Sequence, residues 1–252
     1  MAKKSKGDRK GSHPIDERKK SAFTESLYNI DKNKSKSFYL PQPKSLAKNQ
    51  IVVIEKFFNA DICNELISSF QSSDILGLET TELQKSKEYA ARVNDRALVT
   101  DFEAANSLWN YLQNVLLQRS DYDDDDDDIN DIRNTFSDAV CLNPRLRIYR
   151  YRRGHYFGQH YDDSVSSPIT NSSEKKTGLT KWTLLIYLTG GEEFKGGGTV
   201  FYFDDTKDSI NFHPSKGAAL LHKHGDDCLR HEGELITEGV KWVLRSDVVY
   251  KN

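Results

Sequence analysis

The segment that decides the fold and the site is G-Q-H-Y-D-D, residues 158–163, in which a histidine and an aspartate lie two positions apart. Alternate side chains of a β-strand point to the same face, so His160 and Asp162 project side by side while Asp163 points the other way. One imidazole and one carboxylate on one face of a rigid strand supply two of the three ligands of a facial metal site. The sequence therefore predicts a metal site whose third ligand is another histidine from far along the chain.

The favoured third ligand is His231, which lies in L-R-H-E-G at residues 229–233, just before the last long predicted strand. Isolated histidines are more often surface or hydrogen-bonded core residues than ligands, so this choice needs a second observation. Lys241, ten residues further on, provides it. The competing histidines after residue 150 are His155, His213, His222 and His224.

Strand alternation predicts that Lys241 and Arg245 point to one face of the last strand, while Trp242 and Leu244 point to the other. A lysine that points into a β core is costly unless an anion pairs with it, and that anion is either a protein carboxylate or a ligand's. Two histidines and one carboxylate hold iron(II) and leave positions open for ligands. Zinc hydrolysis at an open site is an alternative that the ligand types alone leave standing.

Composition places the chain among folded proteins with a polar extension. It has 252 residues, 37% hydrophobic residues, a mean hydropathy of −0.70 and a net charge of −2. Three widely spaced cysteines form neither a disulfide framework nor a C-x-x-C zinc site. No apolar run has the length of a membrane span, and the N-terminus lacks the apolar core of a signal peptide. We therefore expect a soluble protein of the cytoplasm or nucleus that is not secreted.

Residues 1–48 are predicted to be a disordered, basic, polar tail. Two loose lysine and arginine clusters at positions 3–10 and 18–20 suit a nuclear-import signal or a phosphate-binding arm, but interspersed acidic residues favour a solvated tail. A single domain is expected over 49–252. Within it, residues 121–128 form a predicted acidic loop, because an unbroken aspartate run repels itself, and residues 164–180 form a predicted mobile loop near the active site.

The expected elements of the domain are a short strand at 51–54, amphipathic helices beginning near Asp61 and around 108–116, and a series of short strands after Pro144. Strands separated by turn signals, with helices gathered in front of them, indicate an α+β, mainly β protein of sandwich or barrel type. Between the two helices, R-V-N-D-R at residues 92–96 is a polar segment to which the sequence assigns no role.

Three segments together resemble the catalytic core of prolyl 4-hydroxylase-type iron(II)/2-oxoglutarate dioxygenases. They are 147–165 (R-I-Y-R-Y-R-R-G-H-Y-F-G-Q-H-Y-D-D-S-V), 183–203 and 231–250, and the similarity spans about residues 50 to 252. It implies a double-stranded β-helix, the jelly-roll or cupin-like fold, with supporting N-terminal helices. The segment departs from the commonest family pattern at Gln159, where proline is frequent.

The resemblance also implies roles for individual residues. His160, Asp162 and His231 match the family's iron ligands, and Lys241 matches the residue that pairs with the distal carboxylate of 2-oxoglutarate. Further contacts of that carboxylate are implied for the hydroxyls of Tyr151 and Thr183, with Arg245 as the alternative basic partner.

The implied reaction uses Fe(II), with 2-oxoglutarate and O2 as co-substrates, and hydroxylates a C–H bond with release of succinate and CO2. The expected substrate is a prolyl residue of a protein or peptide. The alternatives are the same chemistry on a small molecule or an alkylated nucleobase, and a non-catalytic interaction module on this fold. No membrane partner is expected. The aspartate run and the near-neutral charge disfavour nucleic acid, although the basic tail leaves that partner open.

Overall fold

The computed structural model describes residues 22–32, 40–72, 76–86, 90–118, 126–169, 176–204 and 206–251. Its helices are α1 (Glu25–Tyr28), α2 (Ala60–Ser72), α3 (Phe102–Leu116) and α4 (Asp127–Phe136), with short 3₁₀ turns η2 (Gly191–Glu193) and η3 (Gly225–Asp227). Its strands are β1 (Pro43–Ala47), β2 (Ile51–Ile54), β3 (Glu79–Leu83), β4 (Arg92–Thr100), β5 (Ala139–Leu142), β6 (Arg145–Arg152), β7 (Tyr156–His160), β8 (Ser166–Pro168), β9 (Thr177–Tyr187), β10 (Phe194–Gly196), β11 (Thr199–Tyr202), β12 (Ser209–Phe212), β13 (Ala219–Lys223), β14 (Arg230–Gly233) and β15 (Ile236–Lys251).

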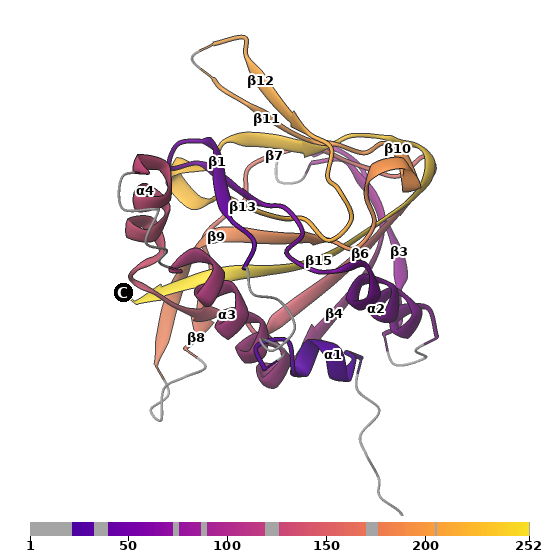
Figure 1. Ribbon diagram of the computed structural model, residues 1–252. Helices are drawn as coiled ribbons and strands as arrows, with labels where there is room; N and C mark the ends of the chain where they lie inside the picture. Colours follow the sequence, from indigo (N-terminus) through magenta and orange to yellow (C-terminus); the bar gives the residue numbers. More distant parts are fainter. Residues whose placement is uncertain are drawn as a thin grey trace, which may run out of the picture.

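The strands form one curled, antiparallel sheet, as the mainly β expectation requires. Along the sheet the order is β1-β2-β13-β9-β15-β6-β4-β7-β14-β11-β12, with β10 and β5 on β15, β3 on β4, and β8 on β9. Strands that are distant in sequence are thereby paired, and the sheet curls so that β14, β11 and β7 lie over β9, β15 and β6 (Figure 1). The sheet curls because each strand is twisted relative to its neighbour.

Strand β15 shows how the sheet separates two cores. Trp242 and Leu244 pack in the cluster that also contains the helices, whereas Val243 belongs to the cluster inside the curl. Lys241 lies on the inner side with Val243 and is 5% exposed. The predicted alternation along this strand is therefore confirmed, and the inner face is the one that can hold a site.

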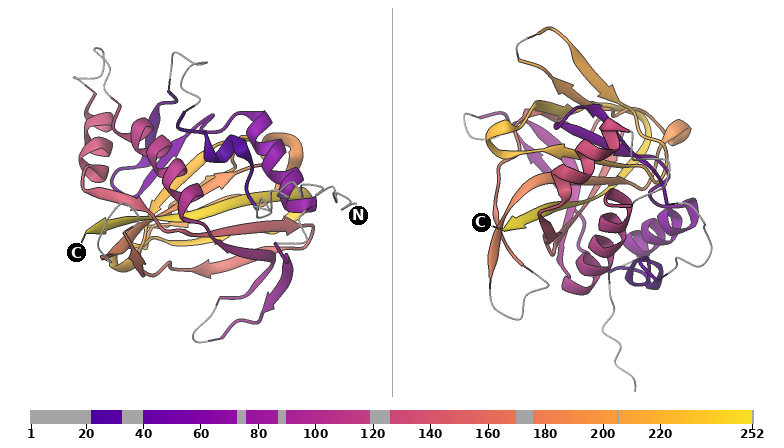
Figure 2. Two further views of the ribbon diagram at one scale, coloured as in Figure 1. Left: turned by 90° about the horizontal axis from the view of Figure 1, so that it is seen from below. Right: turned by 60° about the vertical axis from the view of Figure 1, so that its left-hand side comes forward.

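Helices α2 and α3 cover the outer face of the sheet (Figure 2). The apolar side chains of α3 recur at helical spacing and are buried, with Leu108 and Leu112 fully so. Asp101 caps the N-terminus of α3 by accepting a hydrogen bond from the backbone N–H of Ala104 at 2.9 Å. The helices thus stabilise the sheet from behind and leave the inner face free.

The boundary predicted at residue 48 is wrong for the part of the tail that the structure describes. Phe23, Leu27 and Ile30 are buried in the outer core at helical spacing, and β1 pairs with β2. Three apolar residues within a polar stretch were too sparse to stand out as a periodic pattern, yet they supply one helical face. The two basic clusters lie in residues 1–21, outside the described residues.

Two predicted loops are in part regular structure. Asp126 caps α4, and Asp127 and Asp128 lie in its first turn, where the helix dipole favours negative charge; residues 121–125 lie outside the described part. In the 164–180 segment, β8 pairs with the beginning of β9 as a hairpin, and residues 170–175 are likewise outside the description. The serine- and threonine-rich composition of the 164–180 segment favoured a loop, so the pairing of β8 with β9 was not predicted.

Among the described residues, no helix combines the length and the apolar character needed to cross a membrane.

Candidate metal centre

His160 and His231 face each other across two neighbouring strands. They are register partners on β7 and β14, and their ring centroids lie 4.2 Å apart. The Nδ1 atom of His160 donates to the carbonyl oxygen of Gly158 at 2.8 Å, and that of His231 donates to Leu229 at 2.9 Å. Because a carbonyl can only accept, both Nε2 atoms carry a free lone pair. Both are in the form that binds a metal.

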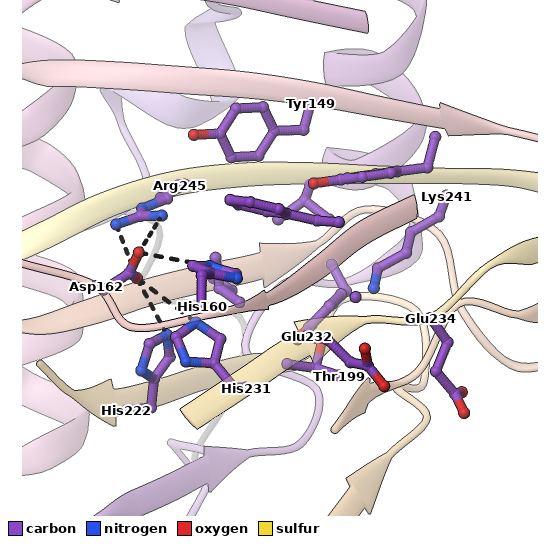
Figure 3. A pocket seen from close by; sticks show the side chains of 16 residues that line it. Tyr149, His160, Asp162, Thr199, His222, His231, Glu232, Glu234, Lys241 and Arg245 are labelled. Carbon is purple, nitrogen blue, oxygen red and sulfur yellow. Dashed lines mark hydrogen bonds and ion pairs between the residues drawn. The ribbon is translucent and has the colours of Figure 1, made fainter. Parts of the chain in front are cut away.

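Asp162 lies where these lone pairs converge. Its carboxylate oxygens are 3.7 Å from Nε2 of His160 and 3.8 Å from Nε2 of His231, and the three ligand atoms lie within 4.8 Å of one another. Ligands of an ion with bonds of about 2.1 Å lie about 3 to 4.2 Å apart, so small side-chain shifts would complete the set. The structure thus brings together the three predicted ligands from β7, the segment after it, and β14 (Figure 3).

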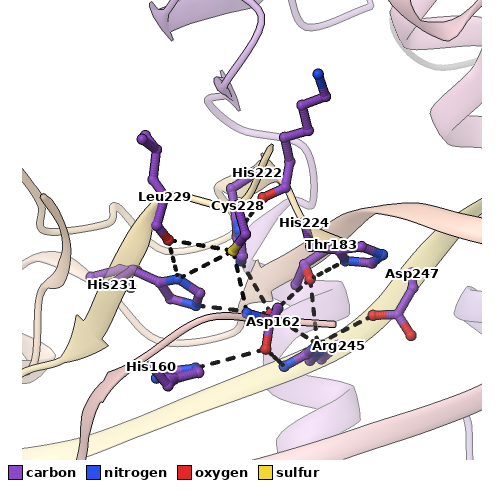
Figure 4. A network of polar contacts seen from close by, with 12 residues as sticks. His160, Asp162, Thr183, His222, His224, Cys228, Leu229, His231, Arg245 and Asp247 are labelled. Atoms are coloured by element: carbon purple, nitrogen blue, oxygen red, sulfur yellow. Dashed lines mark hydrogen bonds and ion pairs between the residues drawn. The ribbon is translucent and has the colours of Figure 1, made fainter. Parts of the chain in front are cut away.

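The carboxylate of Asp162 is held in its charged form. Burial raises the pKa of Asp162, but the Arg245 guanidinium and the neighbouring histidines outweigh burial and bring it well below its usual value. Arg245 Nη2 lies 2.9 Å from Oδ2, and the Thr183 hydroxyl donates to the same oxygen at 2.9 Å (Figure 4). A charged carboxylate with fixed orientation is what a metal ligand requires.

The imidazoles are neutral at physiological pH. Burial and the neighbouring His231 lower the pKa of His160 to about 4, and burial also lowers the pKa of His231. Metal binding at neutral pH therefore requires no deprotonation of these two histidines.

The far end of the same pocket is built around Lys241. Its Nζ donates to the Gly197 carbonyl at 2.5 Å and lies 5.8 Å and 5.2 Å from the ring centroids of Tyr151 and Tyr187. Burial lowers the pKa of Lys241 to about 7. Figure 3 shows Lys241 at one end of the pocket and the Asp162–Arg245 pair with the histidines at the other. No carboxylate of the described residues lies at bonding distance from Lys241 Nζ, and a buried ammonium of this kind favours a bound anion.

Residues 146–246 match the family described as the 2OG-Fe(II) oxygenase superfamily. The segment that carries the predicted metal ligands is thus the catalytic core of a 2OG-Fe(II) oxygenase. A search of solved structures adds a prolyl-4-hydroxylase from Pseudomonas putida, with 14% identity, a TM-score of 0.50, and coverage of 82% of this chain and 95% of that one. This likeness confirms the double-stranded β-helix. No curated protein sequence matches the chain.

Two further solved structures are similar at lower scores. The viral collagen prolyl hydroxylase of Paramecium Bursaria Chlorella virus-1, in complex with 2OG, is 16% identical with a TM-score of 0.49, and the match covers 81% of this chain and 97% of that one. HygX from Streptomyces hygroscopicus, with nickel and 2-oxoglutarate bound, is 11% identical with a TM-score of 0.45, covering 81% and 84%.

Membership in this superfamily implies Fe(II) and 2-oxoglutarate, and the donor set of this oxygenase fits the metal. Two neutral imidazole nitrogens and one carboxylate on neighbouring strands are the facial arrangement that suits Fe(II) and leaves open positions. Their lone pairs converge on a buried point beside the pocket rather than on solvent. The zinc-hydrolase alternative of the sequence reading has no further support.

Thr183 does not lie at the Lys241 end of the pocket, where the expected contact with the distal carboxylate of 2-oxoglutarate would place it. Its hydroxyl does not line the pocket; it bonds Asp162, accepts from Arg245 at 3.3 Å, and lies 3.0 Å from His224 Nδ1. Arg245 likewise contacts Asp162 and Asp247 instead of lying beside Lys241. Both residues hold the carboxylate of Asp162 in this structure, and Arg245 also lines the pocket; their contacts with 2-oxoglutarate stay predictions.

Two hydroxyls near Lys241 escaped the sequence reasoning. Tyr187 and Thr199 line the pocket, and their hydroxyl oxygens lie 2.8 Å apart. Tyr187 lies in the apolar stretch 182–188 and Thr199 follows three glycines, so neither suggests a ligand contact by its local sequence. Only the pairing of distant strands brings them beside Lys241, so no local pattern could have identified them.

His222 also belongs to the centre. It is 1% exposed, its Nδ1 donates to the Lys223 carbonyl, and its Nε2 lies 3.6 Å from Asp162 with no hydrogen-bond partner among the described residues. With Cys228 and His231 it forms a second cluster of metal-binding atoms (Figure 4). Of the other competing histidines, His224 bonds Thr180 and Thr183, and His213 stacks on Phe194 away from the pocket.

Proposed function

We propose that this oxygenase hydroxylates a C–H bond of a prolyl residue in a protein or peptide. The observation that carries the proposal is one pocket in which His160, Asp162 and His231 converge at one end and Lys241 lies buried at the other. The prolyl assignment is supported by the resemblance of the three sequence segments to prolyl 4-hydroxylases. The similarity to the Pseudomonas putida prolyl-4-hydroxylase is consistent with it at the level of the fold.

In this proposal His160, Asp162 and His231 hold the iron, and Lys241 pairs with the distal carboxylate of 2-oxoglutarate. The bound iron and 2-oxoglutarate supply oxidising power, since one atom of O2 enters the substrate as 2-oxoglutarate loses CO2 and becomes succinate. The rings of Tyr151 and Tyr187 lie near Lys241, and the Tyr187 hydroxyl lies 2.8 Å from that of Thr199, so these three hydroxyls would orient the carboxylate there.

The remaining residues orient the ligands and exclude water. Arg245 and Thr183 fix the carboxylate of Asp162 through its Oδ2 atom. The ring of Phe157 stacks on His160 with centroids 3.7 Å apart, which fixes the imidazole plane. Tyrosine and phenylalanine rings from both layers close the pocket walls, so the reaction is shielded from bulk water.

The proposal is tested by succinate formation and by the mass of the product. The protein with Fe(II), 2-oxoglutarate and O2 should form succinate without added substrate at a slow, uncoupled rate, and His160→Ala and Asp162→Ala should abolish it. His213→Ala, an exposed histidine outside the pocket, is the matched control and should leave it unchanged. Unaltered succinate output in the ligand variants would refute the site.

The substrate class is tested separately. Mixtures of proline-containing peptides, treated with the wild type and with His160→Ala, should differ by single oxygen atoms located on proline by fragmentation. Oxygen found on a small molecule or on an alkylated nucleobase, and on no peptide, would replace the prolyl assignment while leaving the dioxygenase chemistry intact.

A further inference from the structure

The polar segment at the beginning of β4 packs against two rings of the pocket wall. Arg92 is the register partner of Phe157 on β7, and Arg96 is that of Tyr149 on β6, so both arginines project from the face to which these pocket-lining rings belong. The contacts agree, because Arg92 lies 5.0 Å from the Phe157 ring centroid and Arg96 lies 5.5 Å from that of Tyr149. Stacking on aromatic faces leaves the guanidinium edges free to bind a ligand.

Neither arginine has an acidic partner among the described residues, which sets them apart from the other arginines on this face. Arg147 pairs with Asp247 at 2.9 Å, and Arg245 pairs with Asp162. The side chains of Arg92 and Arg96, by contrast, form no hydrogen bond or ion pair with another described residue, and their contacts are with the rings of Phe157 and Tyr149. Their like charges are close enough to act on each other, since burial and Arg96 lower the pKa of Arg92.

The aspartate of the same segment is not available to neutralise them. Asp95 points to the opposite face of β4, where it is fully buried and binds Arg150 at 2.6 Å and Arg152 at 3.0 Å. Its charge is therefore already balanced by two cations. Two neighbouring guanidinium groups on the pocket face are left without a counter-charge from the described protein.

An unpaired polar atom occurs at the same place. The Nε of Arg92 is buried without a hydrogen-bond partner, and Asn94, between the two arginines on the same face, is 0% exposed and lies beside the Tyr151 hydroxyl. A buried polar group without a partner is costly, so the unpaired Nε of Arg92 beside the pocket wall points to a ligand that completes its bonds.

We propose that Arg92 and Arg96 bind the carboxylate of an acidic side chain in the peptide substrate, close to the residue that is oxidised. This rests on the proposed function in taking a peptide as the substrate. A guanidinium pair matches the planar geometry of a carboxylate, and Arg92 donates from an edge that Phe157 keeps fixed.

The structure also limits how far that acidic residue lies from the oxidised one. Arg92 stacks on Phe157 at 5.0 Å, and Phe157 stacks on the metal ligand His160 at 3.7 Å. An extended peptide spans about 3.3–3.6 Å per residue. An aspartate or glutamate within about three residues of the oxidised position therefore reaches the guanidinium pair.

The inference is tested by binding, without turnover. The full chain, loaded with Fe(II) and 2-oxoglutarate under argon, is incubated with a peptide library that has a central proline and randomised flanking positions, and bound peptides are sequenced. We expect Asp and Glu to be enriched about tenfold at one flanking position by the wild type. Arg92→Gln and Arg96→Gln should lose this enrichment. Arg153→Gln, which removes one charge from an exposed turn, is the control and should keep it.

A charge reversal sharpens the test, because Arg96→Glu should replace the preference for acidic residues with one for lysine or arginine. Absence of acidic enrichment in the wild type would overturn the inference, as would an Arg92→Gln variant that keeps it. So would an enrichment of phosphoserine over glutamate in a parallel library, or a tenfold weaker affinity for 2-oxoglutarate in Arg92→Gln. Wild-type succinate formation, measured on the same preparation, separates these failures from a failure of the proposed function.

Discussion

Replacing Lys241 by methionine should stabilise the protein and weaken its binding of 2-oxoglutarate. Lys241 is 5% exposed, and its Nζ has one hydrogen bond to a backbone carbonyl and two tyrosine rings nearby. Methionine has similar length and no charge, so Lys241→Met removes the buried cation and keeps the packing. The opposite signs of the two effects distinguish a ligand-binding lysine from a structural one.

The magnitude follows from the pKa. Burial lowers the pKa of Lys241 from 10.5 to about 7, and each unit corresponds to about 1.36 kcal/mol. Because the folded lysine is then half neutral at pH 7, its burial costs about 4 kcal/mol of stability at that pH. Between pH 7 and 10.5 the unfolded chain binds more protons than the folded protein, so this cost shrinks as the pH rises, by about 2 kcal/mol between pH 7 and 9.

Chemical denaturation of the protein without 2-oxoglutarate measures these quantities. We expect Lys241→Met to raise the free energy of unfolding by about 2–4 kcal/mol at pH 7 and to remove the increase of about 2 kcal/mol between pH 7 and 9. The control is Lys195→Met, whose exposed lysine pairs with Glu238 at 2.8 Å and should change neither quantity.

Calorimetric titration completes the test. Loss of a charge-assisted contact should raise the Kd for 2-oxoglutarate about 10–100-fold in Lys241→Met, and the wild-type Kd should rise as the pH increases above 7, where the free lysine is neutral. A Lys241→Met variant with unchanged affinity for 2-oxoglutarate would refute the assignment. So would a larger loss of affinity in Arg245→Gln.

Three further outcomes are expected from single substitutions. Thr183→Val removes the hydroxyl that orients Asp162, so the Kd for Fe(II) or Mn(II), measured by titration, should rise about tenfold while the Kd for 2-oxoglutarate stays unchanged. Leu112→Ala opens a cavity in the fully buried face of α3 and should cost about 2–5 kcal/mol in chemical denaturation. Gly178→Ala should lower the Tm, because a Cβ there would lie 2.2 Å from the backbone oxygen of Tyr250, which cannot move without breaking the pairing of β9 with β15.

The sequence was most informative about the direction of side chains within a single strand. The two-residue period of a strand predicted the inward direction of Lys241 on β15. It also placed His160 and Asp162 side by side, although β7 ends at His160 and Asp162 lies in the segment after it. The choice of His231 needed more than periodicity, because His222 is equally buried and lies as close to Asp162. His231 was preferred because Lys241 follows it by ten residues.

Positions that depend on which distant strands are neighbours were not predictable in the same way. Thr183 lies on β9 opposite both His222 and Asp247, and this places its hydroxyl on Asp162 rather than at the Lys241 end. Tyr187, four residues further along β9, carries the hydroxyl that lies near Lys241 instead. A local pattern can give the face of a strand, but the position along a cavity follows from sheet register.

Adjacent residues of β15 face either the helices or the pocket. A substitution at one position therefore changes stability, and a substitution at the next changes ligand binding. Trp242 and Leu244 pack against the helices, while Lys241 and Arg245 point into the pocket. The charged groups of Lys241 and Arg245 do not contribute to apolar packing. Truncation of Trp242 should therefore destabilise the fold and spare the affinity for 2-oxoglutarate in the remaining folded fraction, which is the reverse of the Lys241→Met result. The sheet is stabilised from its outer face, and this allows its inner face to keep a buried lysine that has no carboxylate partner among the described residues.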